Sequence, residues 1–211
     1  MPLFKTINVS PTTQILVWQI TETFEELLQR VVLKEKTQLR LDGMKSEIHQ
    51  RAFLSVRMLL KELDYTDFEL HYDDFGKPFF RDGKHISITH SHQFSSIIVS
   101  DETVGIDIEM QREKIIRIAD KFVDSEFEFL EGKKIQEYIR KLTVIWGAKE
   151  SIFKIRNEKG ISFKNHIKVN NFEIEDQKTT AILEFENLKQ PFSIFFEEIE
   201  NFTLVYAFEK I

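Results

Sequence analysis

The stretch Val104-Gly105-Ile106-Asp107-Ile108-Glu109 decides how the rest of the chain is interpreted. Apolar and acidic residues alternate in it, which is typical of a β-strand with one face in the core. Residues two apart share a face, so Asp107 and Glu109 project together while Ile106 and Ile108 are buried. Their Cα atoms are then roughly 7 Å apart, at about 3.3 Å per residue, and one hard cation such as magnesium can lie between the two carboxylates. An ordinary strand with an acidic solvent side has the same pattern, so both interpretations stay open.

A second motif is Trp146-Gly147-Ala148-Lys149-Glu150-Ser151-Ile152-Phe153-Lys154, which lies in a helix predicted over residues 134–155. Glu150 and Lys154 are four residues apart and therefore share one face of that helix. A weak surface ion pair explains the same spacing. Glycine costs about 1 kcal/mol relative to alanine inside a helix. Gly147 therefore indicates close packing or the approach of a ligand, as does Gly105 in its strand.

Three basic groups are candidates for phosphate binding. Ile88-Thr89-His90-Ser91-His92 ends a predicted strand and sets His90 among hydroxyls. Phe75-Gly76-Lys77-Pro78 predicts a turn that displays Lys77, whose ammonium can bind phosphate as a point charge. The third group lies in or beside a helix predicted over residues 46–63, and it consists of Lys45, Arg51 and Arg57. For each group a solvated polar surface is the alternative.

Periodicity and turn signals predict the remaining elements. We expect a helix at 21–34, with Thr23 and Glu26 as a capping box, and one or two short helices at 115–130. The apolar stripe of the helix over 46–63 begins at Ile48. We expect strands at 14–20, 68–72, 86–89, 94–100, 103–109, 167–174, 180–185, 192–196 and 202–208, with 94–100 and 103–109 forming a hairpin.

Both halves of the chain run from a helix to antiparallel strands. We therefore predict an α+β fold made of two similar halves, residues 1–102 and 103–211. Each half is a long helix packed on a small antiparallel sheet. The halves are expected to be related by a pseudo-twofold axis, with the active site in the cleft between them.

Composition excludes several classes of protein. The 211 residues include no cysteine, which excludes disulfide scaffolds, zinc fingers and thiolate nucleophiles. The formal charge of −6 argues against nucleic acid or an anionic membrane as a partner. The N-terminal stretch has no secretory pattern, and no apolar run approaches about 20 residues. We therefore expect a cytoplasmic protein that contacts neither membrane nor nucleic acid.

The order of these motifs resembles the 4′-phosphopantetheinyl transferase superfamily, particularly its larger monomeric branch, the type that serves surfactin synthetase. The order is Gly-Lys-Pro, Thr-His-Ser and Gly-Ile-Asp-Ile-Glu, followed about 40 residues later by Trp-x-x-Lys-Glu-x-x-x-Lys. Phe122-x-x-x-Glu126 also looks like the family's segment between its two signatures. The resemblance covers about residues 45–165, and Thr89 departs from it by replacing the usual serine while keeping a hydroxyl.

The resemblance implies an activity and a role for each motif. The activity is transfer of the phosphopantetheine arm of coenzyme A to a serine of an apo acyl or peptidyl carrier protein, releasing adenosine 3′,5′-bisphosphate. Asp107, Glu109 and Glu150 would hold magnesium, with manganese as the alternative. Glu150 would also be the general base, and Lys154 would stabilise the leaving phosphate. Coenzyme A would contact Lys77, Thr89, His90 and Lys154, with Lys45, Arg51 and Arg57 near its 3′-phosphate. A monomer is expected, because one chain supplies both walls of the cleft.

Two other functions fit the motifs less well. A metal-dependent phosphoesterase could use Asp107, Glu109 and Glu150, although such enzymes usually carry more ligands at each site. A degenerate, non-catalytic module could bind a carrier protein without modifying it. Turnover without a carrier would indicate the first function, and carrier binding without turnover would indicate the second.

Overall fold

The computed structural model describes residues 3–210 and confirms the predicted α+β class, with antiparallel sheets of four, five and two strands in that range. The chain divides into two compact units, with unit 1 ending at Glu102 and unit 2 beginning at Thr103. The pseudo-twofold relation between the halves and the cleft between them stay predictions. Within residues 3–210, no helix has both the length and the apolar character needed to cross a membrane.

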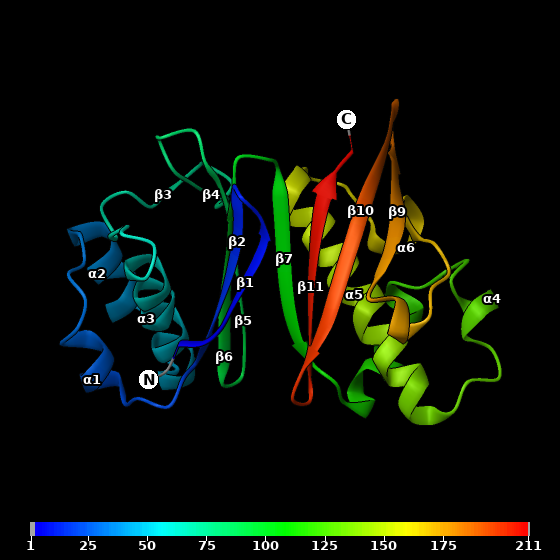
Figure 1. The fold of residues 1–211 in the computed structure, drawn as a ribbon, viewed down its shortest axis with the longest axis horizontal. Coiled ribbons are helices and arrows are strands. Elements are labelled where there is room, and N and C mark those ends of the chain that lie inside the picture. Colours follow the sequence, from blue (N-terminus) through cyan, green and yellow to red (C-terminus); the bar gives the residue numbers. More distant parts are fainter. Residues whose placement is uncertain (1–2, 211) are drawn as a thin grey trace. The chain divides into compact units, whose positions relative to one another are not determined.

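Unit 1 contains a four-stranded antiparallel sheet in the order β1-β2-β6-β5 (Figure 1). Its longest helix, α3, packs against β2 and β6 through a buried apolar core. The elements of this unit are β1 (Leu3–Ser10), β2 (Thr13–Gln19), α1 (Phe24–Leu28), α2 (Glu35–Asp42), α3 (Glu47–Lys61), β3 (His71–Tyr72), β4 (Pro78–Phe79), β5 (His85–Ser91) and β6 (Phe94–Ser100).

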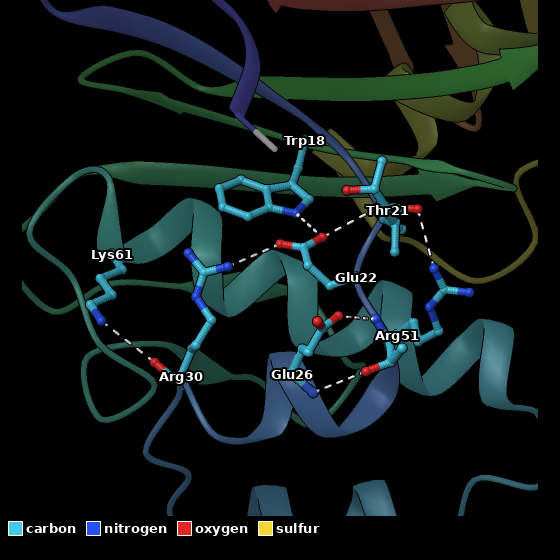
Figure 2. A network of polar contacts seen from close by, with 9 residues as sticks. Trp18, Thr21, Glu22, Glu26, Arg30, Arg51 and Lys61 are labelled. Carbon is cyan, nitrogen blue, oxygen red and sulfur yellow. Dashed lines mark hydrogen bonds and ion pairs between the residues drawn. The ribbon is translucent and has the colours of Figure 1, made fainter. Parts of the chain in front are cut away.

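Helix α1 has the predicted capping box. The Glu26 backbone N–H donates to the Thr23 hydroxyl at 3.2 Å, and the Thr23 backbone N–H donates to the Glu26 carboxylate at 2.8 Å. The helix ends at Leu28, six residues before the predicted end. Beyond it the chain turns so that Arg30 reaches Glu22 at 3.1 Å, and Glu22 also accepts from the Trp18 indole (Figure 2). Glu22 thus holds the segment just after the helix beside Trp18.

Unit 2 contains a five-stranded antiparallel sheet in the order β7-β11-β10-β9-β8, with the 22-residue helix α5 packed on β7 and β11 (Figure 1). The predicted helix over 134–155 is confirmed to within one residue at each end. The elements are β7 (Val104–Met110), η1 (Glu113–Lys121), α4 (Phe127–Leu130), α5 (Ile135–Arg156), α6 (Phe163–His166), β8 (Ile167–Val169), η2 (Ile174–Asp176), β9 (Lys178–Phe185), β10 (Leu188–Ile199) and β11 (Phe202–Glu209).

Several sequence predictions of secondary structure are wrong. Strands β6 and β7 do not form the expected hairpin, because β2 and β5 occupy both edges of β6 while β7 pairs with β11. The strand predicted over 68–72 is reduced to β3, since Thr66 caps a turn there. The strand predicted over 167–174 ends at Val169. Ile48 is 61% exposed in the first turn of α3 instead of buried. Strand β1 and helices α2 and α6 were not predicted.

Helix α5 approaches the sheet of unit 2 unusually closely at two glycines. A Cβ atom built on Gly105 would lie 2.0 Å from the carbonyl oxygen of Ser151 in α5. One built on Gly147 would lie 2.6 Å from Cγ2 of Val205 in β11. Ser151 Oγ also donates to the Val205 carbonyl at 3.2 Å. Both glycines therefore permit the close approach of helix and sheet. Of the two roles that the sequence left open for them, close packing is the one that the structure shows.

The Gly105→Ala substitution tests this packing. The new methyl group would collide with backbone, which cannot rotate away as a side chain can, so we expect the free energy of unfolding to fall by about 3 kcal/mol. Urea unfolding followed by circular dichroism measures the loss. Gly43→Ala is the control, because a Cβ there meets only ordinary contacts at 3.5 Å and beyond. A Gly105→Ala variant as stable as the control would contradict the packing.

Candidate active site

The two signatures of unit 2 meet where α5 crosses β7. Asp107 is 5% exposed and its Oδ1 accepts from Lys154 Nζ at 2.8 Å. Lys154 Nζ also donates to the Ile106 carbonyl at 2.8 Å. Residues 40 or more apart in sequence are thus joined by a partly buried ion pair. Asp107 and Lys154, both predicted as site residues, are brought together by the fold.

Glu150 lies on the same face of α5 and has an unusual proton affinity. The pKa of its carboxyl is raised to about 7, chiefly by burial and then by the negative charge of Asp107, with a smaller contribution from Glu109 and a partial offset by Lys154. The three acidic side chains predicted as metal ligands therefore interact electrostatically. A carboxyl that titrates near neutral pH can take up a proton from a hydroxyl nucleophile at that pH.

The same carboxylates are the candidate metal ligands. Among residues 3–210, no three His, Cys, Asp or Glu side chains are gathered closely enough as placed to hold an ion. The donor chemistry does fit a hard divalent cation, since Asp107, Glu109 and Glu150 offer oxygen ligands only. Their mutual repulsion, which contributes to the raised pKa of Glu150, is what such a cation would relieve.

A small pocket of about 170 Å³ adjoins Glu109. Apolar side chains of η1 and the Trp146 indole of α5 line it, and two cationic residues stand beside them. Sequence patterns did not single out these lining residues as a site, because they come from β7, η1 and α5 together. Besides Glu109, the pocket is lined by Met110, Arg112, Lys114, Ile115, Ile118 and Trp146.

In unit 1, strand β5 carries the predicted Thr-His-Ser motif at its end. Thr89 is 5% exposed, whereas His90 is exposed to solvent. The imidazole of His49, at the start of α3, lies 6.2 Å from that of His90 between ring centroids. The strand pattern could not reveal this neighbour, since His49 lies 41 residues away on a helix.

The other predicted cations of unit 1 are spread over separate elements. Lys77 follows the β3–β4 turn, where its backbone N–H donates to the Asp73 carboxylate at 2.8 Å. Arg51 donates to the Ile20 carbonyl at 3.3 Å (Figure 2). Lys45 is exposed just before α3. Of these, Lys45 presents its charge most fully to solvent.

Arg57 does not suit the phosphate-binding role that the sequence suggested. It is 4% exposed, and its Nε donates to Asp67 at 3.0 Å. Its guanidinium also stacks on the Phe53 ring at 3.7 Å. A guanidinium bound in this way would have to leave a buried carboxylate unpaired in order to reach a ligand, which is costly. Arg57 is therefore a structural residue of unit 1.

Comparison with known proteins agrees with the geometry of unit 2. Residues 103–207 match the family model described as the 4′-phosphopantetheinyl transferase superfamily. One curated relative, 4′-phosphopantetheinyl transferase gsp of Aneurinibacillus migulanus, is 31% identical over 128 residues. That alignment covers 60% of this chain and 52% of the relative, so the chain spans about half the length of the relative it matches.

The raised pKa of Glu150 predicts how stability depends on pH. The native state holds a proton on this carboxyl up to about pH 7, whereas the unfolded state releases it near 4.5. Stability should therefore decline as pH rises from about 5 to about 8. Glu150→Gln mimics the protonated form, so its stability should equal that of the parent at about pH 4 and exceed it by about 2 kcal/mol at pH 8.

Urea unfolding in the presence of a chelator, at both pH values, measures this difference. Glu128→Gln is the matched control, since Glu128 is exposed in α4. An advantage of Glu150→Gln that is equal at both pH values would show that burial and Asp107 do not raise the pKa of Glu150.

Proposed function

We propose that this chain, which belongs to the 4′-phosphopantetheinyl transferase superfamily, transfers the phosphopantetheine arm of coenzyme A to a serine of an apo carrier protein. The observation that carries the proposal is the meeting of the Asp107–Lys154 ion pair with the Glu150 carboxyl where α5 crosses β7. The named activity of the gsp relative supports the same reaction.

The reaction needs an acceptor for one proton and stabilisation of a charged leaving group. The serine oxygen bonds to the phosphorus that carries the pantetheine arm, and the bond from that phosphorus to the bridging oxygen breaks. Adenosine 3′,5′-bisphosphate leaves with the electron pair. Phosphoryl transfer of this kind depends chiefly on positioning and on neutralising charge at the phosphate oxygens.

Glu150 is the proposed general base. Without a metal its pKa of about 7 lies close to neutral pH, where a general base both exists in its charged form and holds a proton well. A cation bound beside it would lower this pKa, and Glu150 would then accept the proton late in the step or through a water. Acceptance of the serine proton would also remove the charge that burial and Asp107 disfavour. The side chain is partly exposed at the surface of α5, so a hydroxyl can approach it.

Lys154 is the proposed stabiliser of the leaving phosphate. An ammonium has three N–H donors, and Asp107 and the Ile106 carbonyl accept two of these bonds. Asp107 thereby holds the cation in place, and the third donor can serve a phosphate oxygen. Lys154 is half-buried, which strengthens its interaction with a phosphate relative to one in bulk water.

Magnesium, with manganese as the alternative, is the proposed cofactor, and Asp107, Glu109 and Glu150 are its proposed ligands. When bound, the ion would neutralise charge on the pyrophosphate of coenzyme A. The all-oxygen donor set and its mutual repulsion support this assignment.

For unit 1 we propose that His90, Thr89 and Lys77 contribute to coenzyme A binding. The exposure of the His90 ring and its neighbour His49 support an anion site at that end of β5. Lys45 and Arg51 are further candidates for the 3′-phosphate, whereas Arg57 is set aside because Asp67 binds it.

The proposed partner is an apo acyl or peptidyl carrier protein. Such carriers are typically acidic, and the net charge of −6 of this chain would oppose their approach unless a basic area faces them. Arg112 and Lys114, beside the apolar pocket at Glu109, supply local positive charge. We further propose that the protein acts as a cytoplasmic monomer; the absence of cysteine fits a reducing compartment.

The direct test incubates the protein with coenzyme A, magnesium and several apo carriers, and follows the intact mass of each carrier. We expect one carrier to gain one phosphopantetheine group, and we expect Glu150→Gln to lose at least about 100-fold in rate, the range typical of general-base removal. Glu128→Gln is the control. No mass gain on any carrier would contradict the proposal. Release of nucleotide without a carrier would favour a phosphoesterase instead.

A second prediction concerns His90. His90→Ala should raise the KM for coenzyme A about tenfold, which corresponds to the loss of roughly one charge-assisted hydrogen bond, while kcat changes little. His85→Ala, at an exposed position of the same strand, should leave KM unchanged. Equal KM values for the two variants would remove His90 from the binding site.

A further inference from the structure

Lys149, the residue before Glu150, is fully buried and fully bonded. Its ammonium donates to a carboxylate oxygen of Glu126 at 2.6 Å, to the Phe122 carbonyl at 2.6 Å and to the Phe163 carbonyl at 3.1 Å. Three N–H donors thus meet three acceptors. Its side chain is 0% exposed, so Lys149 cannot contact a substrate in this arrangement.

Glu126 is equally enclosed. Its side chain is 1% exposed. Besides Lys149, it accepts hydrogen bonds from the backbone N–H groups of Asp124 at 3.1 Å and Val169 at 3.0 Å. The pair therefore connects α5 to the end of η1, to the start of α6 and to strand β8.

An aromatic cluster surrounds this connection. The Trp146 ring, one turn before Lys149 on α5, makes edge-on contacts with Phe122 at 5.1 Å and Phe163 at 5.6 Å between centroids. These are the same two residues whose carbonyls accept from Lys149. The polar and aromatic contacts together hold one side of α5 against η1 and α6.

A buried ion pair is weak evidence for stability, since apolar residues of similar volume often serve as well. The ion pair instead fixes the direction of the Lys149 side chain, because its hydrogen bonds to fixed carbonyls allow the ammonium little rotation. Successive helical residues point about 100° apart. Fixing the direction of Lys149 therefore fixes the direction in which Glu150 leaves the helix.

We propose that Glu126 and Lys149 form a positioning pair that sets the rotation of α5 about its axis and so directs Glu150 toward Asp107. The inference rests on the proposed function for its catalytic consequence. Its structural part, the fixed orientation of α5, stands independently of any activity. Neither residue touches the reacting groups.

The test replaces both partners, using Glu126→Leu with Lys149→Met, so that no buried charge is left unpaired and the fold is kept. The chain has two tryptophans, which makes fluorine NMR of 5-fluorotryptophan protein a local probe. Trp146 reports on α5, and Trp18 in unit 1 is the internal control. We expect several Trp146 resonances, or one at least twice as broad as in the parent, with the Trp18 resonance unchanged.

Kinetics of carrier modification supply the second readout. The double variant should lose at least about tenfold in kcat while its KM for coenzyme A stays within about threefold of the parent. Lys141→Met is the matched control, since Lys141 is a second fully buried lysine of α5 that instead bonds the Phe172 carbonyl and Glu173. The control should keep the parent kcat.

Two results would overturn the inference. One is a single Trp146 resonance as narrow as in the parent, and the other is a double variant with the kcat of the Lys141→Met control. A parent protein without transfer activity would count against the proposed function alone, and the fluorine spectrum would still decide whether the pair orients α5.

Discussion

The close contact between α5 and the sheet of unit 2 is the constraint on which the candidate site depends. At Gly105 there is no space for even one methyl group between strand backbone and helix backbone, and a Cβ on Gly147 would lie 2.6 Å from the Val205 side chain. This short separation lets Lys154 reach Asp107 and brings the charge of Asp107 to bear on Glu150. A larger residue at either glycine would push the helix outward and separate the groups.

Burial and ion pairing then distinguish the charged residues that can take part in a reaction from those that only stabilise the fold. Glu150 is left with a proton affinity near neutrality and a partly exposed surface. In contrast, Lys149 forms a buried ion pair with Glu126, and Arg57 forms one with Asp67. Two charged residues that are adjacent in sequence, Lys149 and Glu150, therefore differ in role. Only their burial and their partners in the folded structure distinguish the structural residue from the one that can react.

The sequence predicted most of the long elements, and it singled out Asp107, Glu150 and Lys154, which the fold brings together. The alternation in 104–109 and the helical periodicity over 134–155 predicted the correct element type, because in each stretch the spacing of the apolar residues alone defines the buried face. The predicted hairpin of β6 with β7 was wrong. Strand pairing depends on which strand edges are already occupied by other strands, and no local sequence pattern encodes this. The same holds for Arg57, whose partner Asp67 lies in a loop, and for the pocket beside Glu109, which three separate elements create.

We propose that the pyrophosphate of coenzyme A reacts beside the acidic side chains of β7 and α5. The decisive measurement is a crystal structure of the protein with coenzyme A and manganese, with anomalous scattering collected at the manganese edge. We expect a manganese peak bonded to carboxylate oxygens of Asp107, Glu109 and Glu150, with the pyrophosphate next to Lys154. Coenzyme A bound with its pyrophosphate away from these side chains, or manganese held elsewhere, would contradict it.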